Sequence, residues 1–262
     1  MKKILKMDEP LITSYPSHAS MLACQMQQPN ALIWYYENYV NLYALNNGRE
    51  SSYINFFAPI PWYANPFLQL QSISREFIQE SGLDIIKFIM DAIKLDHYVF
   101  LSLDISFLKI SKLYGLRSFP HDVFIYGFDK KNEVFYIADF FHSKYECATA
   151  TFDEVYEAYL NADTTKIRDY QFAYLKGILL INPVVPEWYE YNVKKSVSNL
   201  IDYFNSTTSY EGSADGKYYS YYEGCRDIFI FGLEVYEFLR RYVARPRDIE
   251  CPLDFRGFHV LY

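Results

Sequence analysis

A histidine and an aspartate on the two arms of a predicted hairpin are the residues of this sequence best placed to do chemistry together. Residues 121–141 read HDVFIYGFDKKNEVFYIADFF, two apolar runs on either side of Asp129-Lys130-Lys131-Asn132. Aromatic and β-branched runs flanking such a turn predict a β-hairpin. A turn centred near residue 130 places His121 opposite Asp139, and a turn shifted by one residue places them on a diagonal that is still within reach. Alternation puts both side chains on one face of the hairpin.

A carboxylate beside an imidazole points to general base chemistry. The carboxylate fixes the tautomer of the ring and stabilises the imidazolium, which leaves the other ring nitrogen to accept a proton. Such a pair belongs to an enzyme when a nucleophile lies within hydrogen-bond reach. The alternative interpretation of His121 is a structural histidine at the end of a strand.

The nucleophile predicted from the sequence is Cys24, in a short helix expected over residues 18–27. Free N–H groups and the dipole at a helix N-terminus favour a thiolate. Ser20 lies nearer the start of this helix but is a far weaker nucleophile, and a site without any nucleophile is also left open. Gln25 is a candidate oxyanion donor, and His18 is a candidate second polar group in the site.

Composition excludes several classes of protein. The chain has 262 residues, 51% of them hydrophobic and 22% charged, and a net charge of −7. An acidic chain without a basic block argues against binding to nucleic acid or to an anionic membrane surface. The four cysteines stand far apart without a CxxC pair, which predicts no zinc site, no disulfide scaffold and a reducing, cytoplasmic location. We expect no metal or bound cofactor.

The hydrophobic spacing and the cap and turn residues predict an α+β fold. An antiparallel sheet is expected from residues 98–103, 121–128, 133–140 and 170–181. Thr151 and Glu154 form the sequence pattern of a capping box at the start of a helix over 152–161. Apolar spacing predicts further helices over 31–45, 74–94, 187–204 and 226–243, and residues 205–224 are predicted to form a surface loop.

The order of these motifs resembles a known family. A cysteine is followed by HDVFIYGFDKKNEVFYIADFFHSKY and then by TFDEVYEAYLNA. This order resembles papain-like cysteine peptidases that process bacteriocin leaders, and resembles more closely the acyltransferases named for butirosin biosynthesis protein H. The resemblance covers roughly residues 10–180. It implies a papain-like core with Cys24 as nucleophile, His121 as base and Asp139 as the group that orients His121.

The activity that this resemblance implies is amide formation in specialised-metabolite biosynthesis, alongside nonribosomal peptide and polyketide assembly lines. An acyl group would pass from the phosphopantetheine thioester of an acyl or peptidyl carrier protein, through an acyl-cysteine, to a small amine. The alternative is a non-catalytic binding protein of the same fold that holds a carrier-bound or peptide chain. A peptidase is less favoured, because nothing in the sequence suggests a groove for a leader peptide.

Two further expectations concern surfaces and domains. Lys109, Lys112 and Arg117 fall within nine residues just ahead of His121 and predict a basic patch on which an acidic carrier protein docks. Residues 1–182 are expected to form the core, and residues 183–262 a helical C-terminal extension packed on it. The apolar run at 254–262 indicates either a fragment of a longer chain or a docked terminal segment.

Overall fold

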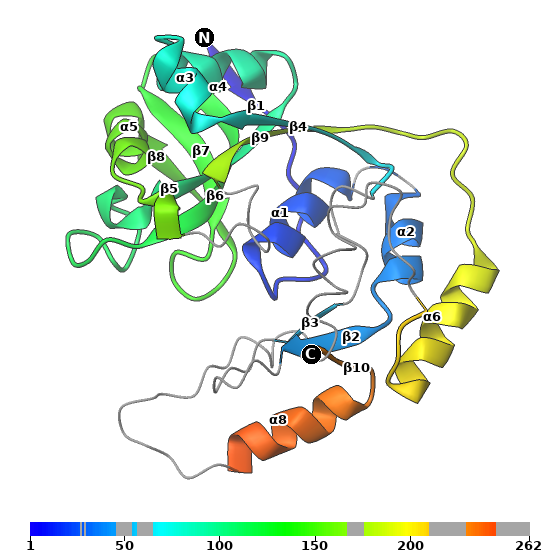
Figure 1. Ribbon diagram of the computed structural model, residues 1–262. Helices are drawn as coiled ribbons and strands as arrows, with labels where there is room; N and C mark the ends of the chain where they lie inside the picture. The colour runs from blue at the N-terminus through cyan, green and yellow to red at the C-terminus, as the bar shows by residue number, and fades with distance from the viewer. Residues whose placement is uncertain are drawn as a thin grey trace. The chain divides into compact units, whose positions relative to one another are not determined.

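The computed structural model describes residues 1–26, 28, 30–45, 54–56, 65–166, 176–209 and 229–244 (Figure 1). The chain divides into two compact units, each built from two separate stretches of sequence. Unit 1 comprises Met1–Gln27 and Pro66–Val184, and unit 2 comprises Gln28–Asn65 and Val185–Tyr262. Helices and antiparallel strands occur together, so the fold class is α+β as predicted.

An antiparallel sheet forms the centre of unit 1. In the described residues it has seven strands in the order β4-β9-β5-β6-β7-β8, with β1 paired to β6. The strands are β1 (Lys2–Ile4), β4 (Leu68–Ser74), β5 (Tyr98–Asp104), β6 (Pro120–Asp129), β7 (Val134–Asp139), β8 (Glu146–Thr151) and β9 (Gly177–Pro183). The four predicted strands are present as β5, β6, β7 and β9. Residues 167–175, which include the predicted start of β9, lie outside the described part.

Helices cover this sheet because its central strands are apolar on both faces. Every residue of β5 is buried, as expected of a strand covered on both sides. The helices of unit 1 are α1 (Pro16–Gln25), α3 (Arg75–Glu80), α4 (Ile85–Lys94) and α5 (Phe152–Leu160). Helix α1 packs against β6 and β7, and α5 against β5, β7 and β8 (Figure 1).

The single helix predicted over 74–94 is two helices. Helix α3 ends at Glu80, and Gly82 adopts a positive φ of 63°, a conformation that favours glycine and stops a helix. Asp84 then caps α4, because its side chain accepts hydrogen bonds from the N–H groups of Ile86 and Lys87. The apolar spacing continues across this break, which is why periodicity alone missed it.

Unit 2 contains a small sheet and three helices in its described residues. The elements are α2 (Ala31–Asn38), β2 (Leu42–Leu45), β3 (Ile54–Phe56), α6 (Val193–Asn205), β10 (Phe229–Phe231) and α8 (Glu234–Ala244), with strand order β10-β2-β3. The predicted helix over 31–45 is therefore wrong beyond residue 38, and the helix over 226–243 is wrong at its start. Leu42–Leu45 and Phe229–Phe231 extend because they pair with each other.

The domain boundary agrees with the sequence at one point only. Unit 1 ends at Val184, close to the expected boundary at 182. Residues 28–65, which the sequence assigned to the core, instead group with the C-terminal part. Their strand β2 pairs with β10, and Asn199 donates a 2.6 Å hydrogen bond from Nδ2 to the carbonyl of Glu37. Most of the predicted loop at 205–224 and the terminal run at 254–262 lie outside the described residues.

Candidate functional site

His121 and Asp139 form a hydrogen-bonded pair in unit 1. His121 lies near the start of β6 and Asp139 is the last residue of β7. His121 Nδ1 and Asp139 Oδ2 are 2.7 Å apart, with the Asp139 side chain completely buried and 27% of the His121 side chain exposed. The predicted pairing of these two side chains is confirmed. A proton on Nδ1 donates to the carboxylate, so Nε2 is the basic nitrogen of this tautomer.

The register of the hairpin explains why the pair is diagonal. Phe124 is opposite Ala138, and one further step of this register places Val123, not His121, opposite Asp139. A bulge between Ile125 and Gly127 shifts the register nearer the turn. The bulge lies where β1 pairs with β6. The two strands approach closely there, because a Cβ on Gly127 would lie 2.9 Å from the carbonyl oxygen of Lys3. Glycine at 127 is therefore needed for β1 to pair here.

Phe119 and Asp122 are two further neighbours of His121. The ring of Phe119 stacks on the imidazole with centroids 5.6 Å apart. Asp122, which is half-buried, follows His121 in the strand. Burial raises the pKa of Asp122 to about 6, and the nearby Asp139 raises it while His121 opposes the shift. Asp139 Oδ1 has no hydrogen-bond partner among the described residues.

Cys24 lies in surroundings that do not favour a thiolate. It is the penultimate residue of α1, at the C-terminal end of the helix, where the dipole disfavours a thiolate. The side chain is buried, and Sγ donates to the Met21 carbonyl at 3.2 Å. Burial raises the pKa of the thiol well above its usual range. Cys24 also acts electrostatically on the hydroxyls of Tyr98 and Tyr145, both of which have raised pKa values.

The other site residues predicted on α1 are also buried. His18, Ser20 and Gln25 each expose 1% or less of their surface. Ser20 Oγ and Tyr145 Oη are 3.1 Å apart. Burial raises the pKa of Tyr145 well above its usual range, and Cys24 and Asp139 act in the same direction, so this hydroxyl stays protonated.

Tyr145 is a residue that the sequence analysis missed. Through Ser20 it connects α1 with the segment that follows Asp139. In the sequence, Tyr145 follows Asp139 by six residues, in FFHSKY. This position suggested that Tyr145 lies near the pair, but no pattern in the neighbouring residues indicates that its hydroxyl contacts a helix.

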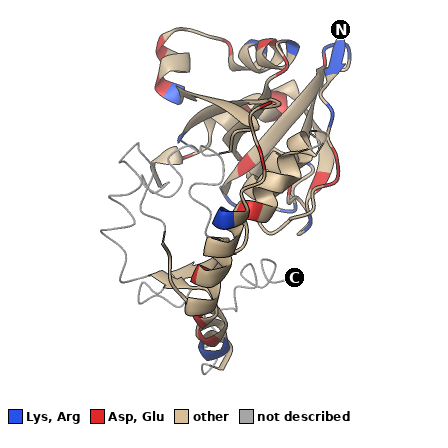
Figure 2. Cartoon of the chain, turned by 90° about the vertical axis from the view of Figure 1, so that its right-hand side faces the viewer, with Lys and Arg blue, Asp and Glu red and all other residues tan. Residues whose placement is uncertain are grey.

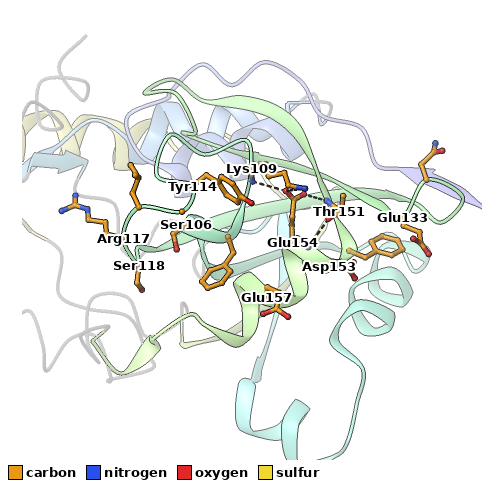
Figure 3. A pocket seen from close by; sticks show the side chains of 15 residues that line it. Ser106, Lys109, Tyr114, Arg117, Ser118, Glu133, Thr151, Asp153, Glu154 and Glu157 are labelled. Carbon is orange, nitrogen blue, oxygen red and sulfur yellow. Dashed lines mark hydrogen bonds and ion pairs between the residues drawn. The ribbon is translucent and has the colours of Figure 1, made fainter.

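The three cations predicted to form a docking patch have separate surroundings. Lys109 Nζ lies 3.8 Å from Glu154 Oε1, and Lys112 Nζ donates to Ser143 Oγ at 2.8 Å. Lys109 and Arg117 line a cleft of about 860 Å³ (Figure 3), and Lys112 is not among its lining residues. Blue and red segments are interspersed along the described chain (Figure 2). Docking of a carrier protein on Lys109, Lys112 and Arg117 stays a prediction.

Within the described residues, no group of three or more His, Cys, Asp or Glu side chains is arranged to hold a metal ion. No helix in this part of the chain is both long enough and apolar enough to span a bilayer.

The chain matches no protein-family model and no curated protein sequence. The resemblance to the acyltransferases named for butirosin biosynthesis protein H, and with it the papain-like core, therefore stays a prediction from the quoted motifs.

Proposed function

We propose that unit 1 is an acyltransferase of the papain-like, butirosin-protein-H-like kind, which moves an acyl group from a carrier-protein thioester to an amine. The observation that carries the proposal is the 2.7 Å bond between His121 Nδ1 and the buried Asp139 carboxylate. A buried carboxylate that holds one ring nitrogen prepares the other for general base catalysis. His121 retains part of its exposure, as a base that meets an external substrate requires.

In this reaction His121 carries the proton from the attacking amine to the leaving thiolate. The neutral amine attacks the thioester carbonyl, a C–N bond forms, and His121 Nε2 accepts the proton that the nitrogen loses. Collapse of the tetrahedral intermediate breaks the C–S bond, and the imidazolium returns the proton to the leaving thiolate. Asp139 stabilises the imidazolium between these two events.

Direct transfer fits the surroundings of Cys24 better than an acyl-cysteine does. A nucleophilic cysteine is expected to be partly exposed and to have a lowered pKa, whereas Cys24 is buried and its pKa is raised. The same observation favours the second candidate function, a non-catalytic protein of this fold that binds a carrier-bound or peptide chain. In that case His121 and Asp139 are a structural pair.

Amide formation from an acyl N-acetylcysteamine thioester and a simple primary amine tests the proposal, with the product measured by mass spectrometry. His121→Ala and His121→Gln should lower the rate by about 10²–10⁴-fold, the usual contribution of a general base. Cys24→Ala should stay within a few-fold of the wild type, and the intact protein should carry no acyl adduct.

The alternatives give different results. Loss of activity in Cys24→Ala, together with an acyl adduct on Cys24 of the wild-type protein, would establish the acyl-cysteine route instead. A wild-type protein that binds the thioester but forms no amide, with equal binding by His121→Ala, would support the binding protein.

A further inference from the structure

Helix α6 of unit 2 carries its large apolar side chains on the side that faces solvent. They recur three, four and seven residues apart, a spacing that places them on one stripe of a helix. Each is between 44% and 64% exposed, namely Val193, Val197, Leu200, Ile201 and Phe204. We call these five residues the α6 stripe. The described part of the chain leaves this stripe uncovered.

The opposite side of α6 is polar, and this side attaches the helix to its neighbours in unit 2. Ser196 and Asp202 are buried. Asn199 donates from Nδ2 to the carbonyl of Glu37 in α2, on which α6 packs (Figure 1). Asp202 Oδ2 accepts from the N–H of Ser209 at 2.7 Å, in the segment that follows α6. Packing through the polar side leaves the apolar side outward.

This orientation is the reverse of the usual one. A surface helix normally turns its apolar stripe to the core, as α8 does with Val235, Phe238, Leu239 and Tyr242. Monomeric proteins rarely expose a contiguous apolar patch larger than a few hundred Å², and larger patches mark interaction sites. The α6 stripe therefore indicates a surface that another molecule covers.

The stripe matches a second copy of itself when the two helices run antiparallel. Residues whose position numbers have the same sum then lie opposite each other, so Val193 meets Phe204 and Val197 meets Leu200. At both points a smaller side chain meets a larger one, which suits the interdigitation of packed helices. A two-fold axis requires a self-complementary surface of this kind.

Charge favours the same arrangement. Lys194 is the only charged residue of α6 that borders the stripe, because Lys195 and Asp202 lie on the polar side. In an antiparallel pair, Lys194 of each copy lies beside Phe204 of the other copy, and an ammonium group is attracted to an aromatic ring. The two Lys194 side chains are then at opposite ends of the pair, whereas a parallel pair would bring these like charges together.

The exposed apolar area is near what a dimer needs. A standard interface buries about 800 Å² per partner, and the five half-exposed side chains supply on the order of 500 Å² of this. Trp188 and Tyr191, which are exposed just before α6, add aromatic area next to the stripe along the chain. An interface of this size is typical of a dimer that forms reversibly.

We propose that this protein forms a two-fold symmetric dimer through the α6 stripe, with the two α6 helices antiparallel. The dimer does not depend on the acyl transfer proposed above.

Sedimentation equilibrium of the full chain over a range of micromolar concentrations tests the proposal. The average mass should rise with concentration toward twice the monomer mass. Added salt should favour the dimer, because each copy carries a net charge of −7 and the copies repel one another. Val197→Lys and Leu200→Glu should each raise the dissociation constant about ten-fold or more, because each places a charge against an apolar side chain of the other copy.

A mixture of these two variants tests the antiparallel register. In the mixed dimer the introduced lysine lies opposite the introduced glutamate, and the second Val197–Leu200 contact is unchanged. The mixture should therefore dimerise within a few-fold of the wild type. Val243→Lys is the matched control, because Val243 is an exposed valine of α8 outside the stripe. It should leave the dissociation constant unchanged.

A wild-type chain that stays monomeric at every concentration would overturn the proposal and leave the stripe to a different partner. Equal weakening by Val243→Lys, or single variants that fail to dimerise when mixed, would contradict an antiparallel interface through α6. Failure of the proposed function is a separate result, because His121→Ala should dimerise as the wild type does even if it forms no amide.

Discussion

Burial distinguishes His121, the predicted base, from Cys24, the predicted nucleophile. His121 and Asp139 meet at a strand end where the imidazole keeps part of its exposure. Cys24 is 2% exposed and donates its thiol proton to the backbone of its own helix. Residue type made Cys24 the natural nucleophile, but its place at the C-terminal end of α1 withholds the stabilisation that a helix N-terminus would give a thiolate.

Alkylation should therefore follow exposure and not the predicted catalytic role. Near neutral pH, iodoacetamide should label the exposed Cys147 at least ten-fold faster than the buried Cys24 in the native protein, because a buried thiol with a raised pKa supplies almost no thiolate. Site-resolved mass spectrometry measures both rates. In denaturant the two rates should become similar. Faster native labelling of Cys24, reduced by His121→Ala, would restore the acyl-cysteine mechanism.

Asp122 should make the stability of the protein depend on pH. Burial raises its pKa from 3.8 to about 6 in the folded chain. The unfolded state then binds fewer protons between these values, so stability falls as pH rises through that window and the full penalty is present above it. Below about pH 4 the penalty is absent, because both states are protonated.

Asp122→Asn removes this penalty because the amide does not ionise. The variant should be more stable than the wild type above pH 6, by up to about 3 kcal/mol at roughly 1.36 kcal/mol per pKa unit, and the gain should disappear near pH 4. The half-exposure of Asp122 makes this an upper limit. Urea denaturation at pH 4 and pH 7.5 measures both differences. An equal effect at the two pH values would show that Asp122 does not titrate as described.

At the scale of elements, α5 shows how a local motif fixes the start of a helix. Thr151 Oγ1 accepts from the N–H of Glu154, and Glu154 Oε2 accepts from the N–H of Thr151, which is the predicted capping box. Glu154 Oε1 also accepts from the N–H of Lys109 at 3.2 Å. One carboxylate thus links the start of α5 to the loop that forms a wall of the cleft.

Removal of the cap should destabilise the fold by a modest amount. Thr151→Ala leaves the N–H of Glu154 without its side-chain acceptor, so the free energy of unfolding should fall by about 1 kcal/mol (range ~0.5–2). Thr149→Ala, an exposed threonine on the same strand, is the matched control and should cost less than about 0.5 kcal/mol. Chemical denaturation compares the two variants. Equal losses would mean that strand propensity and not capping is responsible.

At the scale of the whole molecule, the chain leaves unit 1 after residue 27 and returns at residue 66. The intervening stretch belongs to unit 2, where α2 packs on α6 and β2 pairs with β10. Glu37 of α2 accepts hydrogen bonds from Tyr189 and from the N–H of Asn192, ahead of α6. The two stretches of sequence that form unit 2 therefore share one sheet and one helix pair.

Truncation after Val184 should expose α2 and leave unit 1 folded. Trp34 and Tyr35 are 2% and 3% exposed in the full chain, and the truncated chain lacks the helix on which α2 packs. Chymotrypsin should then cut at these residues much faster than in the full chain, while Phe100 and Phe124 in the sheet of unit 1 stay protected. Limited proteolysis with mass spectrometry measures this. Equal protection of α2 in both chains would support the single core over 1–182 that the sequence suggested.

The sequence by itself determined the features that depend on neighbouring residues. Alternation in 121–141 placed His121 and Asp139 on one face, and the spacing of Thr151 and Glu154 placed the start of α5, because both patterns are set by local backbone geometry. Tertiary structure alone decided that Leu42–Leu45 is a strand and that Cys24 is buried. It also decided that α6 packs through its polar side, which leaves Val193 and Phe204 exposed. Strand pairing, burial and the side on which a helix packs all depend on segments distant in sequence, and no local pattern encodes which segments will meet.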